Sequence, residues 1–187
     1  MEIKFKSLGL ILGLTSVIIS FFFFGRQIGV YQILLISGLL ISFICYLIII
    51  FSKTPIKSKL TWTIVILLAI AVQYFSEPLL IKYSYWTYLY SNKKELTEVN
   101  GILKDKKSEI VILNDAVRVK DGVLSENEKQ ELLKLRKKLD VYYISKSEAG
   151  VYFGLWGFLD VRHGLTYWTS SEIPNSTYQH LTQNWYY

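Results

Sequence analysis

Three long apolar runs stand in the first part of the chain and constrain what it can fold into. They cover residues 8–25, 30–51 and 60–81. A helix needs about 20 mostly apolar residues to cross a hydrocarbon layer of roughly 30 Å, and the first two runs carry no charge. The sequence therefore predicts three transmembrane helices within residues 1–83, followed by a soluble domain over residues 84–187.

The distribution of basic residues predicts the orientation of these helices. Residues 1–83 hold seven of the 21 Lys and Arg residues but two of the 15 acidic residues, and the rest of the chain is nearly balanced. Lysines precede the first run and separate the second from the third, whereas Arg26 is the only charge between the first two. Because Lys-rich and Arg-rich links stay in the cytoplasm, we expect a cytoplasmic N-terminus and an extracytoplasmic C-terminal domain. No small-residue cleavage site follows the first run, so we expect this span to be retained in a cytoplasmic (inner) cell membrane.

Small residues recur along one face of the first run, at Gly9, Gly13, Ser16 and Ser20. Small side chains let two helices approach closely where water cannot drive their association. We expect them to pack against another helix of the same chain, and the alternative is dimerisation into a homo-oligomer or docking to another membrane protein.

Two polar residues, Gln73 and Glu77, lie four positions apart in the third run. An ionisable group inside a span is costly and marks a candidate functional position. Glu77 is about one turn from the end of the run, so contact with headgroup water explains it as well. Small-solute transport through these residues is left as an alternative function.

Residues 84–187 have the pattern of an α+β domain with a mainly antiparallel sheet. An aromatic segment at 83–90 is typical of a membrane boundary, and apolar residues at helical spacing follow it. Strand-like runs at 109–113 and 116–120 flank a turn and predict a hairpin. Ser125 and Glu128 form a capping box that predicts a helix over 125–139. Further strands are expected at 141–145, 151–159 and 165–169, with a turn near 160–164, about five strands in all. The tail over 170–187 is expected to be ordered by its contacts, with its aromatic residues packed back on the sheet or at the membrane boundary.

The run 151–159 is apolar on both faces, which is typical of a central strand or of a binding surface. Gly154 and Gly157 within it indicate a bulge. The aromatic residues Tyr152, Trp156 and Phe158 alternate along one face, and Trp168 follows in the next strand. Because aromatic side chains are frequent anchors of interfaces, we expect these four to form a surface that binds a protein or envelope partner.

The densest polar cluster is Asp160, Arg162 and His163. A carboxylate-oriented imidazole can serve as a general base, so a membrane-bound enzyme using these residues is an alternative. No motif presents a nucleophile, a nucleotide site or a metal site, and Cys45 is the one cysteine. We therefore expect no metal and no cofactor, and the balanced charge of the domain argues against nucleic acid.

These observations favour a non-enzymatic integral membrane protein. Its membrane-spanning helices would display the C-terminal domain to a partner. The protein would serve as an accessory subunit, a sensor or an immunity-type protein.

Overall fold

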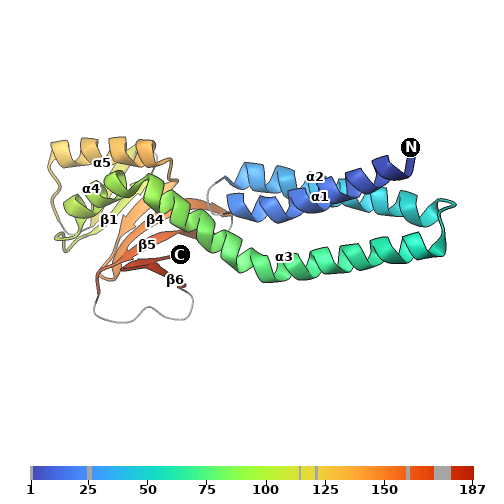
Figure 1. Ribbon diagram of the computed structural model, residues 1–187. Helices are drawn as coiled ribbons and strands as arrows, with labels where there is room; N and C mark the ends of the chain where they lie inside the picture. Colours follow the sequence, from blue (N-terminus) through green and yellow to red (C-terminus); the bar gives the residue numbers. More distant parts are fainter. Residues whose placement is uncertain (1, 25–26, 114, 121, 159–160, 171–177) are drawn as a thin grey trace. The chain divides into compact units, whose positions relative to one another are not determined.

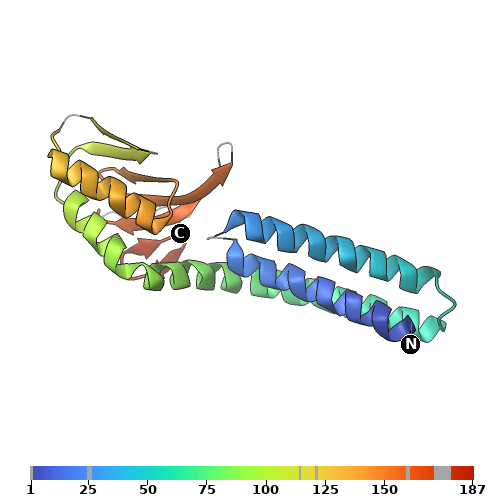
Figure 2. The same cartoon turned by 90° about the horizontal axis from the view of Figure 1, so that it is seen from above.

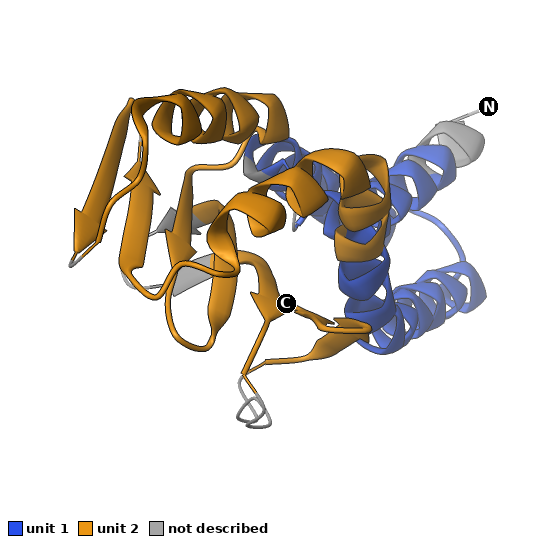
Figure 3. Ribbon diagram, turned by 90° about the vertical axis from the view of Figure 1, so that its left-hand side faces the viewer, with its two compact units in different colours: residues 1–84 blue, residues 85–187 orange. Residues whose placement is uncertain are grey.

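The computed structural model describes residues 2–24, 27–113, 115–120, 122–158, 161–170 and 178–187. The chain divides into two compact units, Met1–Ser84 and Tyr85–Tyr187 (Figure 3). The helices are α1 (Glu2–Phe23), α2 (Ile28–Phe51), α3 (Ile56–Ser91), α4 (Lys93–Leu103) and α5 (Glu126–Leu139). The strands are β1 (Glu109–Leu113), β2 (Ala116–Lys120), β3 (Tyr143–Lys146), β4 (Gly150–Phe158), β5 (Val161–Trp168), β6 (His180–Thr182) and β7 (Trp185–Tyr186).

The N-terminal unit consists of α1, α2 and the larger part of α3. Helices α1 and α2 lie side by side along most of their length (Figures 1 and 2). Polar contacts tie α3 to α2, because the hydroxyls of Tyr46 and Thr63 are 3.2 Å apart. The Lys59 ammonium also donates to the Ile50 carbonyl at 2.5 Å. These bonds join the ends of α2 and α3 that are adjacent in sequence.

Two described helices are long and apolar enough to cross a membrane, over Gly29–Phe51 and Ile56–Ser91. The apolar part of α1, Ser7–Phe23, is shorter, so the expectation of three such helices is met for two of them. Their large side chains are exposed within the chain, with Phe51 83% and Phe75 75% exposed. The core helix of a soluble domain would bury such residues. The apolar surface of these helices therefore needs a cover that the chain itself does not supply.

The C-terminal unit is built on a seven-stranded sheet of order β2-β1-β3-β4-β5-β7-β6. All its pairings are antiparallel, and β4 is the central strand. The expected hairpin is confirmed as β1 and β2, in which Glu109 pairs with Lys120 and Leu113 with Ala116. The α+β class of this unit and its mainly antiparallel sheet are thereby confirmed.

Helices α4 and α5 cover one face of this sheet. Leu132, Leu135 and Leu139 of α5 are buried, and so are Leu96, Val99, Asn100 and Leu103 of α4. They meet the sheet residues that alternate inward, such as Ile112, Ile144 and Phe153, all fully buried. The core of the unit lies between these two layers.

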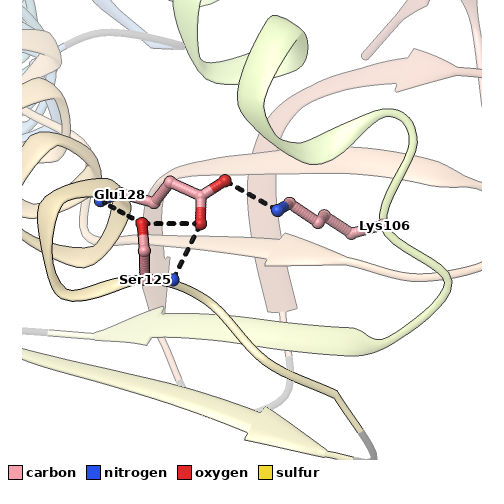
Figure 4. Close-up of polar contacts among 3 residues, drawn as sticks. All are labelled: Lys106, Ser125 and Glu128. Carbon is pink, nitrogen blue, oxygen red and sulfur yellow. Dashed lines mark hydrogen bonds and ion pairs between the residues drawn. The ribbon is translucent and has the colours of Figure 1, made fainter.

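The capping box at the start of α5 is present as the sequence predicts (Figure 4). The Glu128 amide donates to the Ser125 hydroxyl oxygen at 3.2 Å, and the Ser125 amide donates to the Glu128 carboxylate at 2.8 Å. Lys106 adds an ion pair to Glu128 at 2.6 Å. The Ser125 hydroxyl also donates to this carboxylate at 2.9 Å. Lys106, the Ser125 amide and the Ser125 hydroxyl together hold the pKa of the Glu128 carboxyl down at about 2.

Two expectations for the last part of the chain are wrong, whereas the tail packs on the sheet as expected, with the Trp185 ring 5.7 Å from that of Phe153. The sheet has seven strands where about five were expected, because β6 and β7 form within the tail and pair with β5 through Trp185. Strand β5 begins at Val161, so residues 161–164 are extended and do not form a turn. Backbone pairing with β4 supplies the hydrogen bonds that a turn would have needed from side chains.

The aromatic segment at 83–90, which was expected to lie at the membrane boundary, is divided between a buried and an exposed face. Tyr85, Tyr88 and Leu89 are buried at 2%, 6% and 7% exposure, whereas Trp86 and Tyr90 are exposed. The Tyr88 hydroxyl donates to the Leu139 carbonyl at 2.6 Å. The last turns of α3 therefore belong to the core of the C-terminal unit, since one helical face of the segment packs inward.

Candidate functional site

The histidine of the predicted polar cluster, His163, lies in β5. Its ring stacks on Trp156 with centroids 4.1 Å apart. Burial lowers the pKa of the His163 imidazole, so the ring is neutral at neutral pH. Asp160 and the side chain of Arg162 lie outside the described residues, and the cluster stays a prediction.

Tyr152 and Trp168, from the predicted aromatic surface, are both half-buried. Tyr152 stands opposite Thr166 in the sheet and its ring lies 5.4 Å from that of Tyr143. Trp168 packs edge-on against Tyr178, with ring centroids 5.5 Å apart. Each ring has an aromatic neighbour from another segment, so part of its surface is used within the unit.

A bulge in β4 changes the position of Trp156. Gly154 pairs with Gly164, but Trp156 pairs with His163, so two residues of β4 stand opposite one residue of β5. The expected bulge is thus present, and it ends the simple alternation of faces along the strand. Because of the extra residue, Trp156 and Tyr152 do not lie on the same face of the sheet. The side chain of Phe158 is not among those described.

The glycines of the first run lie against α2. A Cβ on Gly9 would stand 2.7 Å from the Cys45 sulfur. A Cβ on Gly13 would stand 2.4 Å from the Ser42 hydroxyl and 2.8 Å from the Gly38 carbonyl. The close approach of α1 and α2 requires glycine at Gly13, where backbone atoms of α2 lie within 3 Å, whereas at Gly9 the Cys45 side chain would have to move.

The serines of the same face are buried or half-buried. The Ser16 hydroxyl donates across to the Leu34 carbonyl of α2 at 3.1 Å. Ser20 is fully buried and donates to the Val17 carbonyl of its own helix at 2.7 Å. The small residues of α1 therefore serve packing within the chain. Gln73 and Glu77 are half-buried on α3, and their proposed role in transport stays a prediction.

The C-terminal unit contains a cavity of about 390 Å³, within the range of small-molecule sites. Trp86 and Tyr90 of α3 form one wall, with parallel rings 5.5 Å apart. Helix α4 forms another wall, and Tyr167 and Trp185 line the cavity from β5 and β7.

The width of the sheet explains this cavity. Seven strands spaced about 4.8 Å apart span roughly 29 Å, whereas two helices packed at about 10 Å cover roughly 20 Å. Helix α5 contacts β1 and β2, at one edge. Near β5 and β7 helices α4 and α5 therefore do not close the inner face, and the cavity lies there, between α4, the last turns of α3 and the sheet.

Helix α4 presents a polar stripe to the cavity, formed by Lys93, Thr97, Asn100 and Lys104. Their spacings of four, three and four residues place them on one helical face. Within the described part of the chain, neither Lys93 nor Lys104 forms an ion pair. The nearby carboxylate of Glu95 is instead paired with Lys138 at 2.6 Å, so both lysines of the stripe have their charge available.

Asn100 is the most unusual residue of this stripe. It is 6% exposed, and its Oδ1 atom is buried with no hydrogen-bond partner among the described residues. An unsatisfied buried polar atom costs about 1–3 kcal/mol. Such a cost is tolerated at sites where a ligand supplies the missing bond.

Gly101 adjoins Asn100 on the cavity wall. A Cβ built on Gly101 meets nothing within 4 Å. Glycine inside a helix costs about 1 kcal/mol relative to alanine, and no packing contact requires it here. A larger side chain at Gly101 therefore has open space on the cavity wall to enter.

Reasoning from the sequence missed this cavity. The signal present was the polar stripe at helical spacing on α4, which a reader assigns to a solvated face. What makes it a cavity wall is the approach of Tyr167 and Trp185, residues distant in sequence. Across the described residues, no group of three His, Cys, Asp or Glu side chains is placed to hold a metal ion.

Comparisons with known proteins give no relative: no family model, no curated protein and no solved structure matches this chain.

Proposed function

We propose that this protein is a non-enzymatic integral membrane protein whose C-terminal unit binds an envelope partner in the cavity beside α4. Three N-terminal helices cross a cytoplasmic membrane, and the C-terminal unit stands on the extracytoplasmic side. The accessory, sensor and immunity-type roles all share this arrangement.

The exposed apolar surface of α2 and α3 supports the membrane part of the proposal. The apolar part of α1 is at the lower end of the lengths that span a bilayer, about 17 residues. Its close packing against α2 favours a shared environment for the two helices. The lysines at residues 4, 6, 53, 57 and 59 support a cytoplasmic N-terminus.

The observation that carries the binding function is the cavity with its unsatisfied Asn100 oxygen. Its lining includes no carboxylate, imidazole or thiol side chain among the described residues. Histidine is the most frequent general base, and thiols and carboxylates are frequent nucleophiles. Aromatic walls with a few polar groups are typical of binding sites, so the cavity favours recognition over catalysis.

The topology is tested by reporters fused after Tyr187. We expect alkaline phosphatase, which is active only outside the cytoplasm, to be active, and a cytoplasm-only fluorescent protein to be dark. The reverse pattern would contradict the proposed orientation. Fusions after Lys57 are the matched control and should give the opposite result.

The binding site is tested by photo-crosslinking in intact membranes. A photoreactive amino acid in place of Tyr90, in the cavity wall, should capture a partner. The same substitution at Tyr142, which is 60% exposed and does not line the cavity, is the control. Capture at Tyr90 should vanish when Gly101→Leu fills the cavity. Equal capture with and without that change would reject the cavity as the site.

The alternative of a membrane-bound enzyme using Asp160, Arg162 and His163 is favoured by the half-buried position of His163, where burial lowers the pKa of the imidazole. In that case His163→Ala abolishes a hydrolytic or transfer activity while the melting temperature is unchanged. Under the proposal above, His163→Ala leaves partner capture at Tyr90 intact.

A further inference from the structure

We infer that the cavity takes a hydroxyl-bearing organic phosphate, with the phosphate at Lys93 and a ligand hydroxyl at Asn100. The inference rests on the proposed binding function and names the ligand chemistry of the same site. Two sources can supply such a ligand. One is a membrane lipid whose headgroup carries the phosphate and the hydroxyl, and the other is a free polyol phosphate.

The charge pattern of α4 decides where the anion lies. Lys93 is the first residue of the helix and Lys104 follows its last residue. The N-terminal end of a helix carries partial positive charge and favours phosphate, whereas the C-terminal end disfavours it. Lys93 and the positive end of the helix dipole therefore both attract a phosphate. Lys104 lies at the negative end of the dipole, which attracts the Lys104 ammonium and disfavours a phosphate.

The unsatisfied oxygen of Asn100 decides the second contact. A buried acceptor without a partner requires a donor from the ligand, and a hydroxyl supplies one. Asn100 is seven residues beyond Lys93, which is about 10 Å along the helix axis. Both residues line the same cavity, so phosphate and hydroxyl on one small headgroup can meet both.

The walls favour a ligand with an apolar portion. Trp86 and Leu89 of α3 and Trp185 of β7 line the same cavity. Along α3, Trp86 lies five residues past Ile81, about 7 Å, which matches the depth of the headgroup layer beyond the hydrocarbon. If residues 60–81 span the membrane, a lipid headgroup is within reach of this wall, so the lipid is the source to expect.

The test is calorimetric titration of the full chain, purified in an uncharged detergent. The probes are short-chain phosphatidylglycerol, short-chain phosphatidylcholine, glycerol phosphate and inorganic phosphate. We expect phosphatidylglycerol to bind at least tenfold more tightly than phosphatidylcholine, and glycerol phosphate more tightly than inorganic phosphate. Lys93→Gln should weaken phosphatidylglycerol binding about tenfold, the loss typical of one charged hydrogen bond.

Matched variants separate this site from general charge attraction. Lys94→Gln removes a neighbouring lysine that does not line the cavity. It should change the affinity by less than about threefold. Equal losses in Lys93→Gln and Lys94→Gln would show diffuse attraction and overturn the inference.

Asn100→Leu distinguishes a ligand contact from a structural role. It removes the unsatisfied oxygen, so we expect a higher melting temperature together with weaker binding of phosphatidylglycerol and glycerol phosphate. A lower melting temperature with unchanged affinity would reject the Asn100 contact, as would equal binding of glycerol phosphate and inorganic phosphate.

The remaining outcomes separate the ligand chemistry from the proposed function. Phosphatidylcholine carries a phosphate but no headgroup hydroxyl. Equal binding of phosphatidylglycerol and phosphatidylcholine, both lost in Gly101→Leu, therefore overturns the inference of a hydroxyl-bearing phosphate and keeps the cavity as a binding site. Failure of the Tyr90 capture to respond to Gly101→Leu removes the binding function itself. Glycerol phosphate binding as tightly as the lipid supports the shared chemistry and identifies the free polyol phosphate as the ligand.

Discussion

At the residue scale, Lys146 shows how burial and charge compete in this domain. It is the only charged residue among the buried residues described, at 6% exposure. It pairs with Ile110 and Val151 in neighbouring strands, and its ammonium donates to the carbonyl of Ser147. Burial lowers the pKa of the Lys146 ammonium, and Glu148 opposes that shift. The Ser147 carbonyl is thus the hydrogen-bond partner described for the buried Lys146 ammonium.

Lys146→Met is expected to stabilise the protein by about 1 kcal/mol at pH 7. The folded-state pKa lies below the unfolded one, so the penalty is full below the folded pKa and is relieved as pH rises toward the unfolded value. Stability of the parent protein should therefore rise with pH in that window, and the variant should lack this rise. Denaturant unfolding in detergent measures both. Lys107→Met, at an exposed lysine, is the control and should change little.

At the element scale, local and tertiary forces stabilise different helices. Helix α5 has its own start signal in Ser125 and Glu128, together with a basic last turn that matches its dipole. Helices α1 and α2 have no side-chain caps described, and they depend on close packing through Gly13 and Gly38. Changes in pH should act on the first kind, and changes in side-chain size on the second.

Glu128→Gln is expected to flatten the acid dependence of stability. The folded-state pKa of Glu128 is about 2 and its ordinary value is 4.5. A depressed carboxyl stabilises the folded state above 4.5, and this contribution is lost as the pH falls toward 2. Unfolding midpoints measured at pH 6 and pH 3 should therefore differ less in Glu128→Gln than in the parent. Glu131→Gln, at an exposed position of the same helix, should keep the parent's difference.

Gly13→Leu is expected to separate α1 from α2. The new side chain would occupy the space of Ser42 and the Gly38 carbonyl, and overpacking of this kind costs about 1–3 kcal/mol. The melting temperature in detergent should fall. Gly29→Ala is the matched control, because a Cβ there meets nothing within 4 Å. A Gly13→Leu protein that melts with the parent would contradict the described packing.

At the scale of the whole molecule, α3 is the element shared by the two units. Its first part carries the exposed apolar surface, and its last turns bury Tyr85, Tyr88 and Leu89 in the C-terminal unit. Tyr85 also stacks on Tyr187, with ring centroids 4.8 Å apart. The end of the chain is thus packed against the helix that opens the unit.

A fragment of residues 85–187 is expected to fold, and one of residues 93–187 is not. The shorter fragment loses the Tyr85–Tyr187 stack and the bond from Tyr88 to Leu139. Each large buried side chain that is removed costs about 2–5 kcal/mol, and two or three such losses approach the stability of a small domain. Circular dichroism melting of both fragments measures this. A cooperative melt of 93–187 would show that α3 is dispensable.

Patterns of short range could be read from the sequence because their causes are local. Alternation over residues 109–120 and a turn between them produce the β1–β2 hairpin, and Ser125 with Glu128 begins α5. Continuous apolarity over 30–51 and 60–81 marks the two helices that can cross a membrane. In each case the residues that determine the element lie within it or beside it.

Only the tertiary structure decided the strand order, the bulge that moves Trp156 beside His163, and the division of the aromatic segment into buried and exposed faces. It also decided the cavity, because a polar stripe on α4 becomes a wall only when Tyr167 and Trp185 stand opposite it. These features depend on contacts between residues far apart in the chain. Local periodicity reports which face of an element is apolar, but not what that face meets.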